Sequence, residues 1–340
     1  MNSSAARVLL ASAAAIPMLT SCAAGSPSPS TPFTSQPNQV SNVSHQTTCH
    51  CLYVANSGGN SITVYSIGST GNAAPSEYIY GSNTDLSSPL GVAVDSTGNI
   101  YVANYGDDSV SVYAAGATGN VTPTAIINGS NTQLDEPAGV GIDPVNADIY
   151  VDNYAGGPSG GGSVTFYASG SNGNVTPLGT IAGSNTGLYG NSGLALDSNG
   201  NLYVPITTNI INVYAPGSTG NVVPTLTIGG SFTKLDEPTQ VALDSSLNIY
   251  AANYDGTSVT AYPAGVNGNV PPSLDISGKK TKLDGSIGVA LDSHANIYAS
   301  NYSDNTITIY SAASTGDVKP SGIIKGKKTK LDEPFGIAIH

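Results

Sequence analysis

A phrase of sixteen residues, GNIYVANYGDDSVSVY at 98–113, recurs in variant form along most of this chain. Six copies follow one another, and their shared tyrosine returns every 47 to 53 residues. These tyrosines are Tyr53, Tyr101, Tyr150, Tyr203, Tyr250 and Tyr298. Repeats of this length are single supersecondary units that bury their apolar faces only against neighbouring copies. The chain is therefore expected to fold as six similar modules.

Each copy contains four short runs with the pattern of β-strands. In the second copy these runs are 91–95, 99–104, 109–113 and 124–128. Along the second run, Ile100 and Val102 alternate with Tyr101, and a period of two indicates a strand. The 41 glycines and the low charged fraction of 9% are typical of an all-β protein with many tight turns. Six modules of four antiparallel strands predict a six-bladed β-propeller.

The two ends of the repeat region are complementary. The first copy starts at its second strand, with Leu52, whereas the chain finishes with PFGIAIH at 334–340, a first strand without a second. We expect this last strand to join the first blade and close the ring, because closure removes the exposed edges of an open array. Two β-sandwiches, the rival architecture, predict no such complementary ends. The predicted propeller spans 49–340.

The pattern LDEPxGVAVDxxGNIYVANxxxxSVxVY resembles the NHL repeat, and the resemblance covers 52–340. It implies the same six-bladed propeller, and the absence of tryptophan excludes a WD40 protein. Two features depart from the family pattern, which carries Asp after the second strand and Arg at the start of the third. Ser or Thr stands at the arginine position, and asparagine replaces the aspartate at Asn56, Asn104, Asn153, Asn253 and Asn301. Family functions that depend on those charges are therefore not implied.

The first 48 residues lack the repeat and are expected to lie outside the propeller. Arg7 precedes a short apolar stretch at 8–18, which is too short to span a bilayer as a mature helix. The LTSC that follows, ending at Cys22, resembles the lipobox of bacterial lipoproteins. The resemblance implies a signal peptide at 1–21, cleavage before Cys22 and lipidation of its thiol. An ordinary secretory signal is the alternative.

Residues 22–48 are rich in Ser, Pro and Thr and contain no Lys, Arg, Asp or Glu, so we expect a disordered tether. Ala23, rather than Asp, follows the cysteine, which in Gram-negative lipoproteins implies sorting to the outer membrane. The expected product is an exported, monomeric protein held at the outer membrane or cell surface by a lipid anchor.

Charge is distributed unevenly along the chain. The net charge of −12 argues against nucleic acid as a partner, because phosphates require a basic surface. Arg7 is the only basic residue before Lys234, and nine lysines lie from there to the C-terminus. The lysines gather in GKKTK at 278–282 and KGKKTK at 325–330.

Antiparallel strands divide the connections of a propeller between two faces. The turns from second to third strand, and the connections from each fourth strand to the next blade, share one face, which we call the distal face. The tether enters on the opposite face, so the distal face is expected to point away from the membrane. Four tyrosines follow the second strand on this face, where they could stack on sugars, anchor a peptide or simply pack between blades. They are Tyr105, Tyr154, Tyr254 and Tyr302.

The distal face also carries the lysine clusters and three glutamates. The lysines would form a basic sector for an anionic glycan, phosphate or acidic protein, unless they serve only solubility. They are Lys279, Lys280, Lys282, Lys327, Lys328 and Lys330. Glu136, Glu237 and Glu333 belong to three LDEP phrases that lead into alternate blades. Carboxylates around an axis suit Ca²⁺, but an acidic, solvent-facing turn before a strand is the favoured explanation.

Few residues suggest catalysis. An aspartate ends the first strand of five blades, as Asp95 does in the second copy, and its repetition predicts a turn-forming rather than a catalytic role. Cys49, His50 and Cys51 could hold a soft metal such as Zn²⁺ or form a disulfide, although adjacent ligands suit a tetrahedral site poorly. No cofactor is expected, with Ca²⁺ or another divalent ion as the exception.

These observations favour a cell-envelope lipoprotein whose propeller is a non-enzymatic binding or protein-interaction scaffold for a protein or glycan ligand. The alternative is a metal-dependent lyase or lactonase of the six-bladed propeller superfamily, which would hold a divalent ion in its central channel. The histidine and carboxylate sets of the lyases and lactonases that this fold resembles find no match among the four histidines and the acidic residues of this chain.

Overall fold

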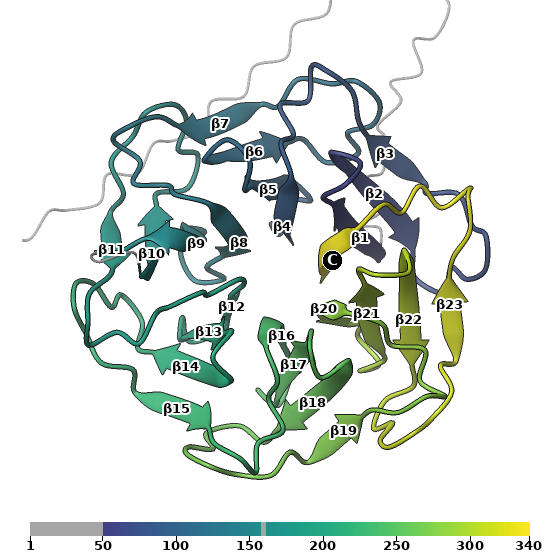
Figure 1. The fold of residues 1–340 in the computed structure, drawn as a ribbon. Helices are drawn as coiled ribbons and strands as arrows, with labels where there is room; N and C mark the ends of the chain where they lie inside the picture. Colours follow the sequence, from purple (N-terminus) through teal and green to yellow (C-terminus); the bar gives the residue numbers. More distant parts are fainter. Residues whose placement is uncertain (1–49, 158–160) are drawn as a thin grey trace, which may run out of the picture. The chain divides into compact units, whose positions relative to one another are not determined.

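The computed structural model describes residues 50–157 and 161–340, and their strands form six four-stranded antiparallel sheets. Figure 1 shows the sheets arranged as blades of a ring, which confirms the predicted propeller. The predicted signal peptide, Cys22 and the tether lie outside the described residues. Within the described part of the chain, no helix is long and apolar enough to cross a membrane.

The strands form four concentric sets around the propeller axis. The innermost are β24 (Pro334–Ile339), β4 (Pro89–Val94), β8 (Pro137–Ile142), β12 (Ala195–Leu196), β16 (Pro238–Leu243) and β20 (Ser286–Leu291). The second are β1 (Cys51–Asn56), β5 (Ile100–Asn104), β9 (Ile149–Gly156), β13 (Leu202–Ile206), β17 (Ile249–Asn253) and β21 (Ile297–Asn301). The third are β2 (Ser61–Ser66), β6 (Ser109–Tyr113), β10 (Gly162–Tyr167), β14 (Ile210–Tyr214), β18 (Ser258–Tyr262) and β22 (Thr306–Tyr310). The outermost are β3 (Glu77–Ile79), β7 (Ala125–Asn128), β11 (Gly179–Ile181), β15 (Leu226–Gly229), β19 (Leu274–Ile276) and β23 (Gly322–Ile324).

The C-terminal strand completes the first blade. Strand β24 pairs with β1 in antiparallel register, with Tyr53 opposite Ala338 and Val54 opposite Ile337. The backbone amides and carbonyls of Cys51 and His340 are also joined, at 2.9 and 3.1 Å. Blade 1 therefore has the same four-stranded composition as the others, as the complementary ends predicted.

The hydrophobic core is divided among the six seams between blades. One cluster combines Ile62 and Val64 of blade 1 with Val92, Ile100 and Val102 of blade 2. The other five seams contain equivalent clusters, including the seam between blades 6 and 1. The second strand of each blade is buried on both faces, because each face meets a different neighbouring blade. Stability therefore depends on a closed ring.

Two kinds of hydrogen-bonded contact recur at the junctions between neighbouring blades. The glycine of each TGN-type turn pairs with the outer strand of the preceding blade, and the pair Gly71–Ile324 repeats this contact where the chain ends meet. A buried tyrosine at the end of each third strand donates its hydroxyl to a threonine carbonyl in the connection that enters its blade. Tyr65 does so with Thr329, across the closure of the ring. Both contacts make the closing seam equivalent to the others.

The asparagines that depart from the NHL pattern are structural. Asn104 is fully buried, and its Nδ2 donates to the hydroxyls of Ser109 and Ser111, at 3.0 Å each. An amide–hydroxyl network thus replaces the aspartate and arginine of the family pattern, so no charge is buried there. The recurrent aspartates hold their own turns: Oδ1 of Asp95 accepts from the backbone amides of Thr97 and Asn99, at 2.9 and 3.0 Å. Their predicted turn-forming role is confirmed.

Candidate functional site

Closely packed innermost segments and the side chain of Gln240 close the axis of the propeller. The third residue of the innermost strand is glycine in four blades, and Gly193, two residues before β12, is the equivalent residue of blade 4. The four are Gly91, Gly139, Gly288 and Gly336. Neighbouring strands approach so closely that a Cβ at Gly139 would lie 2.8 Å from the Cα of Gly193. Only glycine permits this approach. In blade 5 the position is Gln240, so a single side chain enters the space that remains.

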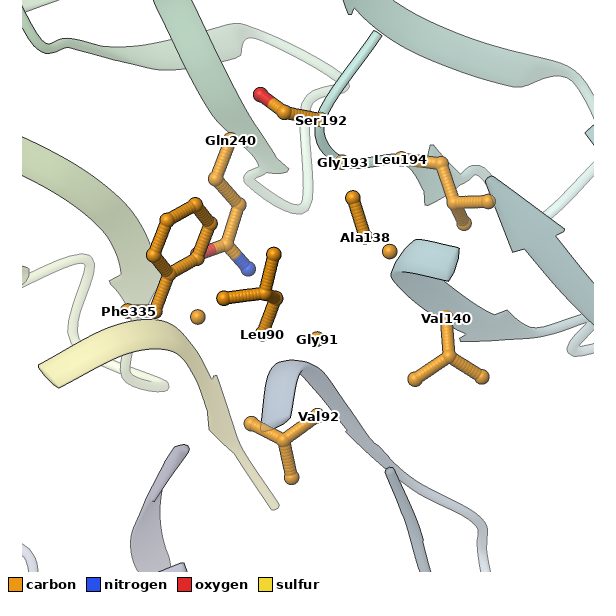
Figure 2. Close-up of a pocket in the computed structure, with 12 residues that line it drawn as sticks. Leu90, Gly91, Val92, Ala138, Val140, Ser192, Gly193, Leu194, Gln240 and Phe335 are labelled. Atoms are coloured by element: carbon orange, nitrogen blue, oxygen red, sulfur yellow. The ribbon is translucent and has the colours of Figure 1, made fainter. Parts of the chain in front are cut away.

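Gln240 joins three blades across the axis. Its Nε2 donates to the carbonyl of Ile337 at 2.9 Å, and its Oε1 accepts from the amides of Ile337 and Val289, at 3.2 Å each. The side-chain amide thereby pairs with Ile337 as a neighbouring strand would. Figure 2 shows this side chain pointing into the central pocket near Phe335 and Leu90. The pocket around it holds only about 10 Å³.

The central channel does not fit the divalent ion that the lyase or lactonase alternative requires. Its lining consists of glycines, aliphatic residues, Ser192, Phe335 and Gln240, with no carboxylate or histidine. The Gln240 oxygen already accepts two hydrogen bonds. Hard divalent cations need several oxygen ligands, and these residues do not supply them.

A larger cavity of about 270 Å³ lies next to this closed axis, at the distal end of the innermost strands. Its lining shares Leu90, Ala138, Ser192 and Phe335 with the central pocket, so the sealed axis is its floor. The remaining lining residues come from the distal ends of the second strands and the turns that follow them, and from the starts of the first strands and the residues just before them. They are Tyr105, Tyr154, Thr207, Glu237, Thr239, Tyr254 and Ile287. We call this space the mouth cavity.

Aromatic rings form two groups around the mouth. Tyr105 and Tyr154 of blades 2 and 3 meet edge to face, with ring centroids 6.4 Å apart. Tyr302 lies 6.5 Å from Tyr254 and 6.4 Å from Phe335 by the same measure. The structure thus brings three of the predicted tyrosines to the mouth, whereas Tyr302 contacts two lining rings and does not itself line the cavity.

The three LDEP glutamates have different surroundings. Burial and the carboxylate of Glu136 raise the pKa of Tyr105, and burial and Glu333 do the same for Tyr302. Glu237 is the one that lines the mouth cavity. Blade 4 has Thr207 where blades 2 and 6 have a tyrosine, so Glu237 lacks the counterpart of the Tyr105 and Tyr302 neighbours of the other two glutamates.

Glu237 belongs instead to an acidic cluster. Burial raises its pKa above the usual value, and the charges of Asp255 and Asp236 raise it further. Among the described residues, no group of three or more histidines, cysteines, aspartates and glutamates could hold a metal ion. Glu136, Glu237 and Glu333 are therefore not gathered as a ligand set; they remain in alternate blades.

The predicted lysines lie on the rim of the distal face, in the connections into blades 6 and 1. All six are exposed. Lys280 forms an ion pair with Asp317 at 3.6 Å, and Lys234 forms one with Asp275 at 2.8 Å. None of these lysines lines the mouth cavity, so the basic sector and the mouth are separate features.

The cysteine–histidine cluster is only partly within the described residues. Cys49 lies outside them, whereas Cys51 is disulfide-bonded at the start of β1. A disulfide sulfur is not the thiolate that binds metal, so a metal site at Cys49, His50 and Cys51 would require reduction of that bond.

A buried acid distinguishes the seam between blades 3 and 4. Asp152 is fully buried, and burial raises its pKa well above the usual value. Asn191 donates to Oδ1 of Asp152, whereas Oδ2 of Asp152 and Oδ1 of Asn191 find no hydrogen-bond partner among the described residues. Comparison of the repeats could have found both residues, because Asp152 stands where Ala103 occurs in blade 2 and Asn191 where blade 2 has Pro89. The tip of the nearby blade-three insertion, 158–160, lies outside the described residues.

The fold and the mouth cavity define the chain as a six-bladed β-propeller, and comparisons with known proteins agree. The model of the NHL repeat family matches residues 86–113, in blade 2. By sequence, no curated protein matches.

Several solved structures share the fold. A protein of unknown function from Bacteroides caccae is 13% identical, with a TM-score of 0.58 over 85% of this chain and 98% of that chain. A chain of a nidogen/laminin complex is 15% identical, with a TM-score of 0.59 over 85% and 97%. A streptogramin B lyase is 12% identical, with a TM-score of 0.55 over 85% and 91%. At these identities the likeness concerns the fold alone.

Proposed function

We propose that the chain is an exported lipoprotein whose propeller is a non-enzymatic binding scaffold, with the mouth cavity as its ligand site. The observation that carries the proposal is the mouth cavity itself: about 270 Å³, lined mainly by aromatic and aliphatic side chains and closed at its floor. Ligand sites are typically concave and mostly apolar, with few polar groups that orient the ligand. The residues that line the cavity include no general acid–base pair beside a nucleophile, which favours binding over catalysis.

Blocking the cavity tests the binding site. Phe335 occupies the second position of its innermost strand, and Ala138 occupies the same position in blade 3. Ala138→Phe therefore places a second phenylalanine at the mouth, and because Ala138 is buried, the Tm of the variant is measured beside its binding. Ala168→Phe, at an exposed residue after β10 on the opposite face, is the matched control.

The full chain and both variants would be compared on glycan and peptide arrays. We expect a ligand of the wild type to be lost by Ala138→Phe and kept by Ala168→Phe, with similar Tm values for both variants. A ligand that binds Ala138→Phe as well as the wild type would place the binding site elsewhere.

The lipoprotein part of the proposal rests on the LTSC segment and is tested separately. In a bacterial host fed with a palmitate analogue, the wild-type chain should be labelled and should sediment with membranes. Cys22→Ala should abolish both the label and the sedimentation. Labelling that survives this substitution would refute lipidation at Cys22.

A further inference from the structure

The polar groups of the mouth cavity restrict the chemistry of its ligand. The Ser192 hydroxyl donates to the backbone carbonyl of Thr239 at 3.2 Å, and the Thr239 hydroxyl donates to the backbone carbonyl of Ile287 at 2.6 Å. No lysine, arginine or histidine lines the cavity. An anionic ligand would therefore meet no positive charge on the wall. The wall instead offers aromatic rings, hydroxyl groups and a carboxylate.

Aromatic side chains of four blades line the cavity. Tyr105 and Tyr154 contribute from blades 2 and 3, Tyr254 from blade 5 and Phe335 from blade 1. Aromatic rings carry negative potential on their faces and attract a cation within about 6 Å of the ring centre. An organic ammonium group suits such a lining better than a metal ion, because its alkyl groups also gain from apolar contact.

Among the residues that the structure describes, Glu237 forms no ion pair. Burial and the charges of Asp255 and Asp236 raise the pKa of Glu237, because they disfavour its ionised form. Lys234, three residues before Glu237, is engaged by Asp275 at 2.8 Å. A bound cation would relieve the repulsion among these carboxylates and would therefore be favoured over a neutral ligand of equal shape.

We propose that the ligand of the mouth cavity carries an alkylammonium group, held by the tyrosine rings and the Glu237 carboxylate. This inference rests on the proposed function of the cavity as a ligand site. The cavity volume of about 270 Å³ suits a group of the size of choline or a lysine side chain. The shared chemistry is the cationic head, whether it belongs to a small molecule or to a protein side chain.

The test compares choline with 3,3-dimethyl-1-butanol, its neutral isostere, by calorimetric titration of the full-length protein. We expect choline to bind at least 10-fold more tightly than the isostere. Glu237→Gln should weaken choline binding about 10-fold and leave the isostere unchanged. Glu333→Gln, at the same position of another LDEP phrase, is the matched control, because neither Glu333 nor its neighbour Tyr302 lines the cavity; it should change choline binding less than 2-fold.

Titration of Nα-acetyl-lysine methylamide distinguishes the two sources of the ammonium group. Tighter binding of this amide than of choline assigns a protein side chain, and the reverse assigns a small molecule. Equal affinity for choline and its isostere, no binding of either ammonium compound, or choline binding that survives Ala138→Phe would each overturn the inference. If array ligands are nevertheless lost with Ala138→Phe, the proposed function stands and only the ammonium chemistry fails.

Discussion

Gln240→Ala removes the side chain that crosses the propeller axis and leaves the backbone pairing of all six blades in place. The wild-type amide makes three hydrogen bonds, two to Ile337 of blade 1 and one to Val289 of blade 6. Blade 5 is thereby joined directly to the two blades at which the chain closes. The substitution therefore measures how much this cross-axis contact contributes to stability.

The expected loss follows from these three bonds. Each buried hydrogen bond contributes a net stabilisation of about 0.5–1.5 kcal/mol, and leaving its partner unsatisfied costs more. The central pocket adjoins the mouth cavity, so water can reach the backbone groups that lose Gln240 and offset part of the loss. We expect the free energy of unfolding to fall by about 2 kcal/mol. At about 1.6 °C per kcal/mol for a domain of about 290 residues, Tm should fall by about 3 °C.

Urea denaturation and thermal melting, followed by tyrosine fluorescence and circular dichroism, provide the measurement. Gln133→Ala is the control, because Gln133 is an exposed glutamine whose Oε1 accepts one hydrogen bond, from Thr180 at 2.9 Å. That variant should lose less than about 0.5 kcal/mol. If Gln240→Ala is no less stable than Gln133→Ala, the amide does not tie the blades together and our account of the sealed axis is wrong.

Three further outcomes are expected. Asp152→Ala should flatten the pH dependence of the unfolding free energy. In the wild type, folded Asp152 keeps a proton that the unfolded chain releases above about pH 3.9, so the wild type loses up to about 1.4 kcal/mol of stability per pH unit between about pH 3.9 and the raised pKa. Parallel urea-stability curves for wild type and variant between pH 4 and 7 would contradict this account. Tyr65→Phe, at the closing seam, and Tyr113→Phe, at an internal seam, each remove one buried hydrogen bond, so each should lower the unfolding free energy in urea by about 1 kcal/mol. A much smaller loss for Tyr65→Phe would mean that the closing seam is weaker than the others. Gly139→Ala should lower the unfolding free energy by about 1–3 kcal/mol in the same assay, because its Cβ would press on Gly193, and unchanged stability would show that the axis can expand.

The blade number, strand order and ring closure could be predicted because every repeat encodes them independently. The tyrosines from Tyr53 to Tyr298 set the register of the second strands, and the unpaired first strand at 334–340 indicated closure. A repeat that departs from the pattern can still be assigned from the other repeats. Blade 4 lacks the Asn-Tyr pair after its second strand, yet Pro205 still pairs with Ile211 inside a regular sheet.

The mouth could be predicted only in part. The turn positions of Tyr105, Tyr154 and Tyr254 placed them on the distal face, but their distances depend on the tilt of each blade, which no single repeat encodes. Gln240 and Phe335 were missed because they look ordinary within their own repeats. Their importance emerges only when the innermost strands are compared position by position, where one glutamine stands among five glycines.

The backbone hydrogen bonds between Cys51 and His340 bring the two ends of the propeller together, so the first and last blades are joined like any other neighbouring pair. Because the bridge Gly71–Ile324 at this seam repeats the bridges between all the other blades, the ring is the same wherever the polypeptide is opened. A circularly permuted chain, joined at these two residues and cut in the turn at 95–99, would retain every strand pairing.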